Sequence, residues 1–171
     1  MPATTTTEAV QQRLDSTRNE LHEYCVVCSQ RHPLGLHAAY HAVGEHAVEV
    51  SFACGKSYEG YRNVLHGGIV SALLDGAMAN CIFAKGLEAY TVDLRIRFRT
   101  PVEIGMDATI RGEWLRREGK LHLLQAFIIQ DGKIRASARA KFMEGSPGVD
   151  SLPMSKDAST RALVRDGHKR H

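Results

Sequence analysis

The clearest periodic pattern in the chain spans residues 91–100, where apolar and polar positions alternate strictly. The apolar face carries Val92, Leu94, Ile96 and Phe98, and the polar face carries Asp93, Arg95, Arg97 and Arg99. This period of two predicts a strand that is buried on one face. Three more strands are predicted at about 107–117, 121–130 and 133–142. Their joints, Glu118-Gly119 and Asp131-Gly132, suit two-residue hairpin turns because glycine adopts positive φ readily.

A long apolar helix precedes these strands, between His66 and Lys85. Because it is apolar on nearly all sides, we expect it to be buried rather than to lie on a surface. Further upstream, residues 36–53 predict two strands with a turn near Gly44-Glu45, and the spacing of Val10, Leu14 and Leu21 predicts an amphipathic helix. Together these elements predict an α+β fold in which a curved antiparallel β-sheet wraps around one long buried helix.

Length and composition narrow the class of protein. The 171 residues suit one main domain at 25–143, with a helical extension at 1–24 and a flexible or peripheral tail at 144–171. No apolar run is long enough for a membrane span, and the first residues lack the layout of a signal peptide. Four cysteines are too few for a disulfide scaffold, so we expect a cytoplasmic protein. The net charge of +3 comes with no nucleic-acid-binding motif.

Asp75 is the one charged residue within the apolar helix. An ionised carboxylate in apolar surroundings costs several kcal/mol unless partners compensate for it. One interpretation is a structural aspartate that hydrogen bonds satisfy. The interpretation we favour is a nucleophile or general base, because carboxylates with shifted pKa values cluster at active sites.

The start of the same helix supplies backbone donors. Gly67 and Gly68 leave N–H groups at a helix N-terminus uncovered by side chains, which suits a carbonyl oxygen that gains negative charge; alternatively, the two glycines serve only a tight turn or close packing. Gly67 and Asp75 lie roughly 12 Å apart along a helix axis. One small acyl carbon cannot touch both groups of one helix, so we expect a site that two antiparallel copies share.

These residues belong to a larger pattern. It comprises Tyr58-Glu59-Gly60-Tyr61, Leu65-His66-Gly67-Gly68-Ile69, Leu73-Leu74-Asp75-Gly76-Ala77-Met78, Thr91-Val92-Asp93-Leu94 and Phe98-Arg99-Thr100-Pro101-Val102, with Cys25-x-x-Cys28 and Pro33-Leu34-Gly35-Leu36 upstream. The pattern resembles the PaaI-like branch of the hotdog-fold acyl-CoA thioesterases over about residues 25–143. The resemblance implies a hotdog fold, a homo-oligomer (a dimer or a tetramer of dimers) and hydrolysis of acyl-CoA thioesters. It implies no metal and no cofactor, since coenzyme A is part of the substrate.

The resemblance also assigns roles to single residues. Asp75 matches the catalytic acid, and Gly67 matches the glycine whose N–H polarises the thioester carbonyl. His66 holds the position of a histidine that shapes the site, and Thr91 matches a hydroxyl that helps to place the attacking water in some members. The residues expected to contact the substrate are Asn63, Gly68 and Ser71.

The sequence departs from this family at one position. Some members carry Asn or Gln six residues before the histidine to bind the thioester carbonyl, and here that residue is Gly60. Asn63 is the nearest amide and either substitutes for it or leaves the contact missing. The main alternative function is therefore a hotdog protein that binds acyl-CoA without cleaving it. A hotdog dehydratase or hydratase ranks below both, because the histidine stands directly before Gly-Gly.

Two other groups of residues are candidates for ligand binding. Cys25 and Cys28, with His22, His32 and His37 nearby, resemble half of a zinc site but lack a second cysteine pair, so packing under a loop is favoured. Basic residues also gather on one sheet face, namely Arg95, Arg97, Arg99, Arg111, Arg135, Arg139 and Lys141. Most such faces are solvated surface, but some of these residues could bind the phosphates of coenzyme A.

Overall fold

The computed structural model describes residues 3–145, with side chains from Thr7 onward, and contains two α-helices in this range. The predicted tail beyond residue 145 lies outside the described residues. The elements are α1 (Ala3–Leu21), β1 (His41–Ala42), β2 (Ala47–Phe52), the short 3-10 helix η1 (Lys56–Tyr58), α2 (Gly67–Phe83), β3 (Ala89–Phe98), β4 (Ala108–Glu118), β5 (Leu121–Gln130) and β6 (Lys133–Glu144). Neither α-helix combines the length and apolar character that a membrane span needs.

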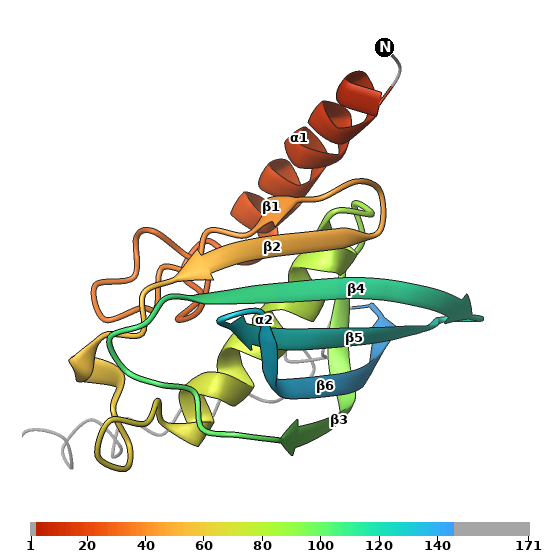
Figure 1. The fold of residues 1–171 in the computed structure, drawn as a ribbon. Helices are drawn as coiled ribbons and strands as arrows, with labels where there is room; N and C mark the ends of the chain where they lie inside the picture. The colour runs from red at the N-terminus through yellow and green to blue at the C-terminus, as the bar shows by residue number, and fades with distance from the viewer. Residues whose placement is uncertain (1–2, 146–171) are drawn as a thin grey trace, which may run out of the picture.

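The described strands form one antiparallel sheet in the order β1-β2-β4-β5-β6-β3, which curls around α2 (Figure 1). Both predicted hairpins are present, but the first turn lies at Gly119-Lys120, one residue later than predicted, because Glu118 still pairs with Leu121. In this turn Gly119 has φ +61°. In the second turn, Asp131 and Gly132 have φ +49° and +67°, and positive φ at both central residues is the geometry of a type I′ turn, which matches the twist of the flanking strands. The prediction of a curved sheet around one buried helix is confirmed.

The prediction of two strands within residues 36–53 was only partly correct. The first strand, expected to begin near Leu36, is reduced to the two residues of β1. The chain before it is held by loop contacts instead: the Leu36 N–H donates to the Val26 carbonyl at 2.7 Å, and the Ala38 N–H donates to the Val27 carbonyl at 2.8 Å. These donors are therefore occupied by residues 26 and 27 rather than by a neighbouring strand of the sheet.

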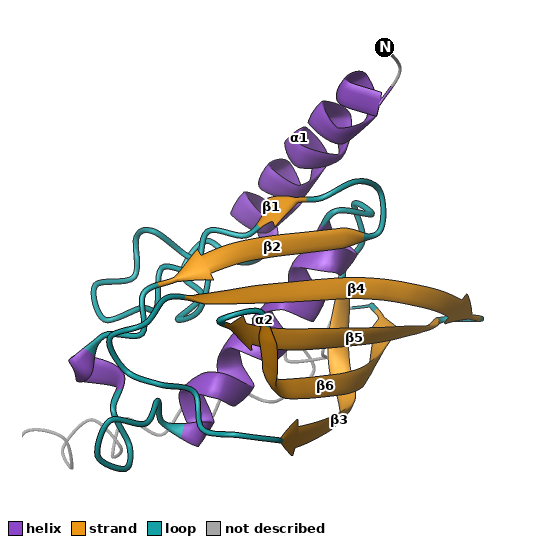
Figure 2. Ribbon diagram, in the orientation of Figure 1, coloured by secondary structure: helices purple, strands orange, loops and turns teal. Residues whose placement is uncertain are grey.

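The helix α1 packs on the body of the domain through its apolar side. Val10 and Leu14 are buried, and the Arg13 guanidinium donates to the Ala84 carbonyl just after α2 at 2.7 Å. The Gln11 side chain accepts from the Ala42 N–H of β1 at 2.7 Å. Apolar burial and two polar contacts thus attach this helix to both α2 and the edge of the sheet (Figure 2).

The sheet and α2 approach closely at Gly112 in β4. A Cβ at this position would lie 2.6 Å from the backbone oxygen of Ala77 in α2. We expect Gly112→Ala to lower the free energy of unfolding by about 1–3 kcal/mol, because the helix backbone must move away from the sheet. Urea unfolding measures the change. Gly55→Ala is the control, since its Cβ meets only ordinary contacts at 3.8 Å or more; equal stability of both variants would contradict the prediction.

The strand β3 forms one edge of the sheet and contains an irregularity. Its pairing with β6 shifts between Thr91 and Asp93, so that Val92 has no partner. Several of its apolar residues are exposed in the single chain, with Val92 at 47% and Phe98 at 57%. A long edge strand with exposed apolar side chains offers free N–H and C=O groups to another strand.

Candidate active site

His66 forms the N-cap of α2 and organises its first turn. Its Nδ1 accepts a hydrogen bond from the Gly68 N–H at 2.9 Å. The Gly68 donor is therefore already used, whereas no acceptor for the Gly67 N–H is found among residues 3–145. At a helix N-terminus a free N–H is well placed to bind an oxygen that carries negative charge.

The Gly67 N-terminus opens into a cavity of about 630 Å³, here called the Gly67 cavity. Its walls are mainly apolar and include Tyr61, Val70, Phe98 and Pro101. Phe98 comes from the end of β3 and lies directly against Gly67, since a Cβ on that glycine would be 3.6 Å from the ring. The cavity is large enough for a small acyl group and its linker.

Asp75 lies two turns further along α2 and is half-buried. Its Oδ1 accepts a hydrogen bond from the Thr91 hydroxyl of β3 at 2.8 Å. Burial raises the pKa of the Asp75 carboxyl above its ordinary value of 3.8, while the Thr91 hydrogen bond and the nearby His22 act in the opposite direction. A carboxyl with a raised pKa is better suited to accept a proton near neutral pH than an ordinary aspartate.

Asp75 lines a different cavity from Gly67. This Asp75 cavity, of about 410 Å³, is formed with Leu21, His22, Tyr90, Thr91 and Phe142. No residue lines both the Asp75 cavity and the Gly67 cavity. Within one chain, therefore, the free N–H and the carboxylate do not face the same space.

Comparison with known proteins relates part of the chain to a family and the whole fold to solved structures. A model of the thioesterase superfamily matches residues 62–135. Residues 62–135 are therefore similar to the thioesterase superfamily. The fold of the chain is the predicted hotdog fold: the Escherichia coli PaaI protein of the phenylacetic acid degradation operon superposes with a TM-score of 0.70 at 18% identity, covering 82% of this chain and 96% of that one.

Two other solved structures resemble this fold. A phenylacetic acid degradation-related protein from Ralstonia eutropha JMP134 is 25% identical, with a TM-score of 0.58 and coverage of 63% of this chain and 85% of that one. A thioesterase protein from Streptococcus pneumoniae TIGR4, solved with coenzyme A, is 18% identical, with a TM-score of 0.59 and coverage of 63% and 84%. No curated protein matches the chain.

The residues predicted to contact a substrate are only partly brought together. The Ser71 hydroxyl donates to the Gly67 carbonyl at 2.8 Å, one turn away in α2. Asn63 has φ +61° and does not line the Gly67 cavity. Gly60 does line it, but a Cβ there would lie 3.0 Å from the Cα of His66. A side chain at this position would therefore crowd His66 as His66 now lies.

Basic side chains form a hollow of about 480 Å³ beside the Gly67 cavity. Its lining includes Arg95, Arg97, Arg99 and Arg139. Arg99 lines both this basic hollow and the Gly67 cavity. Arg111, also predicted on this face, is instead held by Glu49 at 2.5 Å and Glu113 at 2.7 Å, so its charge is already compensated.

Sequence reasoning missed one residue that holds the segment of α2 just before Asp75. Tyr40 is fully buried, and its hydroxyl donates to the Leu73 carbonyl at 2.7 Å, two residues before Asp75. Burial raises the pKa of the Tyr40 phenol, so it stays protonated and donates. A tyrosine in a run predicted as strand gives no sign that it reaches a helix carbonyl.

Proposed function

We propose that the protein hydrolyses acyl-CoA thioesters in a site formed by two copies of the chain. Asp75 of one copy acts as the nucleophile or general base, and the Gly67 N–H of the other polarises the carbonyl. The observation that carries the proposal is the combination of two groups on one helix: a carboxyl of raised pKa that lines a cavity, and the Gly67 N–H at the helix start, which has no acceptor among residues 3–145. The thioesterase superfamily match supports the reaction class.

The chemistry needs few groups. In the general-base route Asp75 takes a proton from water, and the hydroxide adds to the thioester carbonyl carbon. The carbonyl oxygen becomes negative and accepts the Gly67 hydrogen bond. The C–S bond then breaks, and the CoA thiolate takes the proton back from Asp75. The products are a free acid and CoA, and no metal or cofactor takes part.

The edge strand β3 explains how two copies could complete one site. Asp75 contacts the Thr91 end of β3, and Gly67 lies against Phe98 at the other end. Antiparallel pairing of two β3 edges about a two-fold axis sets the Thr91 end of one copy opposite the Phe98 end of the other. Each Asp75 cavity would then meet a Gly67 cavity from the second copy.

The basic hollow suits the charged part of the substrate. Coenzyme A carries phosphates, which arginine guanidinium groups bind well. Because Arg99 lines both the hollow and the Gly67 cavity, a substrate could place its thioester in the cavity and its phosphates in the hollow. The Streptococcus pneumoniae thioesterase protein with coenzyme A supports this ligand class.

The cysteines among the described residues are all unpaired, in keeping with our proposal of a reducing, cytoplasmic setting.

One observation favours a second function, the binding of acyl-CoA without hydrolysis. The position of the carbonyl-binding amide is Gly60, where His66 leaves little room for a side chain. A thiol-release assay over short, long and aromatic acyl-CoAs separates the two functions. We expect enzyme-dependent release of free thiol with at least one of them. Tight binding of acyl-CoA without any thiol release would favour the second function.

The raised pKa of Asp75 predicts the pH dependence. Since the carboxylate is the reactive form, kcat/KM should rise with pH through the Asp75 pKa, and this acid limb should lie above 3.8. Thr91→Val removes a hydrogen bond that favours the carboxylate, so the limb should move to higher pH with little change in the plateau. Thr91→Ser keeps the hydroxyl and serves as the control. An acid limb at the same pH in Thr91→Val and wild type would contradict the prediction.

A further inference from the structure

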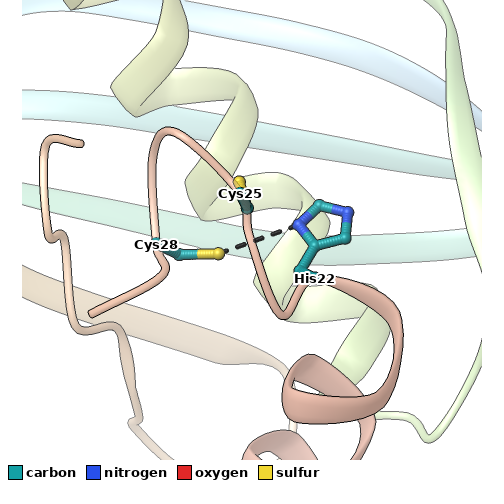
Figure 3. Close-up of side chains that lie close together, drawn as sticks. All are labelled: His22, Cys25 and Cys28. Carbon is teal, nitrogen blue, oxygen red and sulfur yellow. Dashed lines mark hydrogen bonds between the residues drawn. The ribbon is translucent and has the colours of Figure 1, made fainter. Parts of the chain in front are cut away.

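Three potential metal ligands converge where α1 ends, and we call them the His22 cluster. His22, Cys25 and Cys28 lie close together (Figure 3), and their ligand atoms lie within 4.8 Å of one another. The Cys28 Sγ and the His22 Nδ1 are 3.7 Å apart. A tetrahedral zinc ion with ordinary Zn–S and Zn–N bonds holds its sulfur and nitrogen ligands roughly 3.6 Å apart. The spacing is therefore close to that of a loaded site.

The backbone holds these side chains in place. The Cys25 N–H donates to the His22 carbonyl at 3.2 Å, and the Ser29 N–H donates to the Cys25 carbonyl at 3.1 Å. The Val27 N–H points at the Cys25 Sγ, 3.4 Å away, a contact that stabilises a thiolate. The His22 ring packs edge-on against Phe83 of α2, with ring centroids 4.7 Å apart.

The loop between the two cysteines rests directly on α2. A Cβ at Gly76 would lie 2.7 Å from the Val27 side chain. The absence of a side chain at this glycine, next to Asp75, therefore allows the loop to pack against α2. A cavity of about 460 Å³, lined in part by His22, Cys28 and Ser29, reaches the cluster from outside. It gives an ion a route of entry and leaves room for a fourth ligand such as water.

We propose that His22, Cys25 and Cys28 bind one thiophilic metal ion of the Zn²⁺ class. Two thiolates and an imidazole are ligands that zinc favours over magnesium or calcium. The ion would join the end of α1 and the cysteine loop beside α2, next to the Asp75 cavity, which His22 also lines. This role is separate from the proposed hydrolysis, in which the metal takes no part.

The structure selects among the histidines that the sequence offered. His32 lies beside the Tyr24 ring and accepts from the Leu34 N–H at 3.2 Å. The His37 Nδ1 lies 3.1 Å from the Ser29 carbonyl. Only His22 of the three has a ring nitrogen among the cysteine sulfurs in the described cluster.

The test uses the full chain, reduced, stripped with a chelator and titrated with Co²⁺. We expect one equivalent to bind, with the near-ultraviolet charge-transfer absorption of thiolate–cobalt bonds, and Zn²⁺ to displace it. Cys25→Ser and Cys28→Ser should each abolish that absorption, and His22→Gln should weaken Co²⁺ binding by 10-fold or more. Cys54→Ser and Cys81→Ser are matched controls that should keep it, because burial raises the pKa of those thiols to about 11 and about 12.

A second measurement on the unaltered protein guards against misfolded variants. Bound Zn²⁺ should protect Cys25 and Cys28 from alkylation, as located by peptide mass analysis. The proposal is overturned if the reduced chain binds no Co²⁺, if the absorption persists in both cluster variants, or if Zn²⁺ leaves alkylation unchanged. A Cys25–Cys28 disulfide that, once reduced, still yields no Co²⁺ binding would overturn it in favour of a redox pair.

Discussion

Asp75→Asn is expected to lower kcat/KM for acyl-CoA hydrolysis by about 10³-fold, or about 4 kcal/mol of transition-state stabilisation. The amide is neutral at all working pH values, so it can neither take a proton from water nor attack the carbonyl. Its oxygen can still accept the hydrogen bond that Thr91 now gives to the carboxylate. The local geometry should therefore survive while the chemistry is lost, as initial rates of thiol release would measure.

The free energy of unfolding of Asp75→Asn is the control, because it shows whether a loss of activity comes from a loss of folding. Because burial raises the pKa of Asp75, the folded protein holds this proton more tightly than the unfolded chain does. The group therefore makes folding less favourable as the pH rises from 3.8 through the raised value. Asp75→Asn should be at least as stable as wild type at pH 7, with a relative gain that shrinks as the pH falls to about 4. A variant that keeps wild-type turnover would rule out the role of Asp75.

Gly67→Pro is expected to lower kcat by about 10²–10³-fold because it deletes the one backbone N–H assigned to the carbonyl oxygen. Gly67 is the first residue of α2, where proline is well tolerated because its φ suits a helix start. The preceding His66 has φ −58° and ψ 133°, a conformation that a residue before proline adopts easily. A Cβ at this position meets only Phe98, at 3.6 Å.

Gly67→Ala is the matched control, since it adds the Cβ but keeps the N–H, and it should retain most of the activity.

Mixing the inactive Asp75→Asn and Gly67→Pro variants tests whether the site is shared between two chains. If Asp75→Asn and Gly67→Pro chains are unfolded and refolded together in equal amounts as dimers, half of the pairs are mixed and each has one intact site of two. Activity should return to about one quarter of wild type. No recovery in the mixed sample would mean that both groups act within one chain.

The pattern of apolar residues was enough to predict the main architecture. The segment between His66 and Lys85 is apolar on nearly all sides. A helix of this kind is stable only when it is buried, and α2 is covered by the sheet and by other elements. The glycines Gly119 and Gly132 located the two hairpins to within one residue, because both have the positive φ that such turns require. Asp75 and Gly67 stood out from sequence because a charge in an apolar helix and a free helix N-terminus each need a physical explanation.

Strict alternation gave the wrong position for Thr91. It would place this residue on the same face as Asp93 and Arg95, away from the helix. The irregularity after Thr91 leaves Val92 unpaired and sets Thr91 opposite Phe142 on the buried side, where it reaches Asp75. A bulge adds one residue to the period, and nothing local in this sequence marks it.

Contacts between distant segments were also beyond the pattern. The pairing of His22 with the two cysteines depends on where α1 ends, and the closeness of Gly60 to His66 depends on how the loop before α2 folds back. Such contacts depend on tertiary packing and not on periodicity. The sequence therefore offered three candidate histidines, His22, His32 and His37, and could not show which one lies beside the cysteines.

The outer edge of β3, which pairs with no other strand within residues 3–145, has a consequence for how activity would scale in the cell. If each reaction centre needs two chains, a freshly made chain is inert until it meets another. At low abundance, where most chains are single, turnover per volume would grow with the square of protein level rather than in proportion to it. Below a certain expression level, the rate of thioester hydrolysis in the cell would then be negligible.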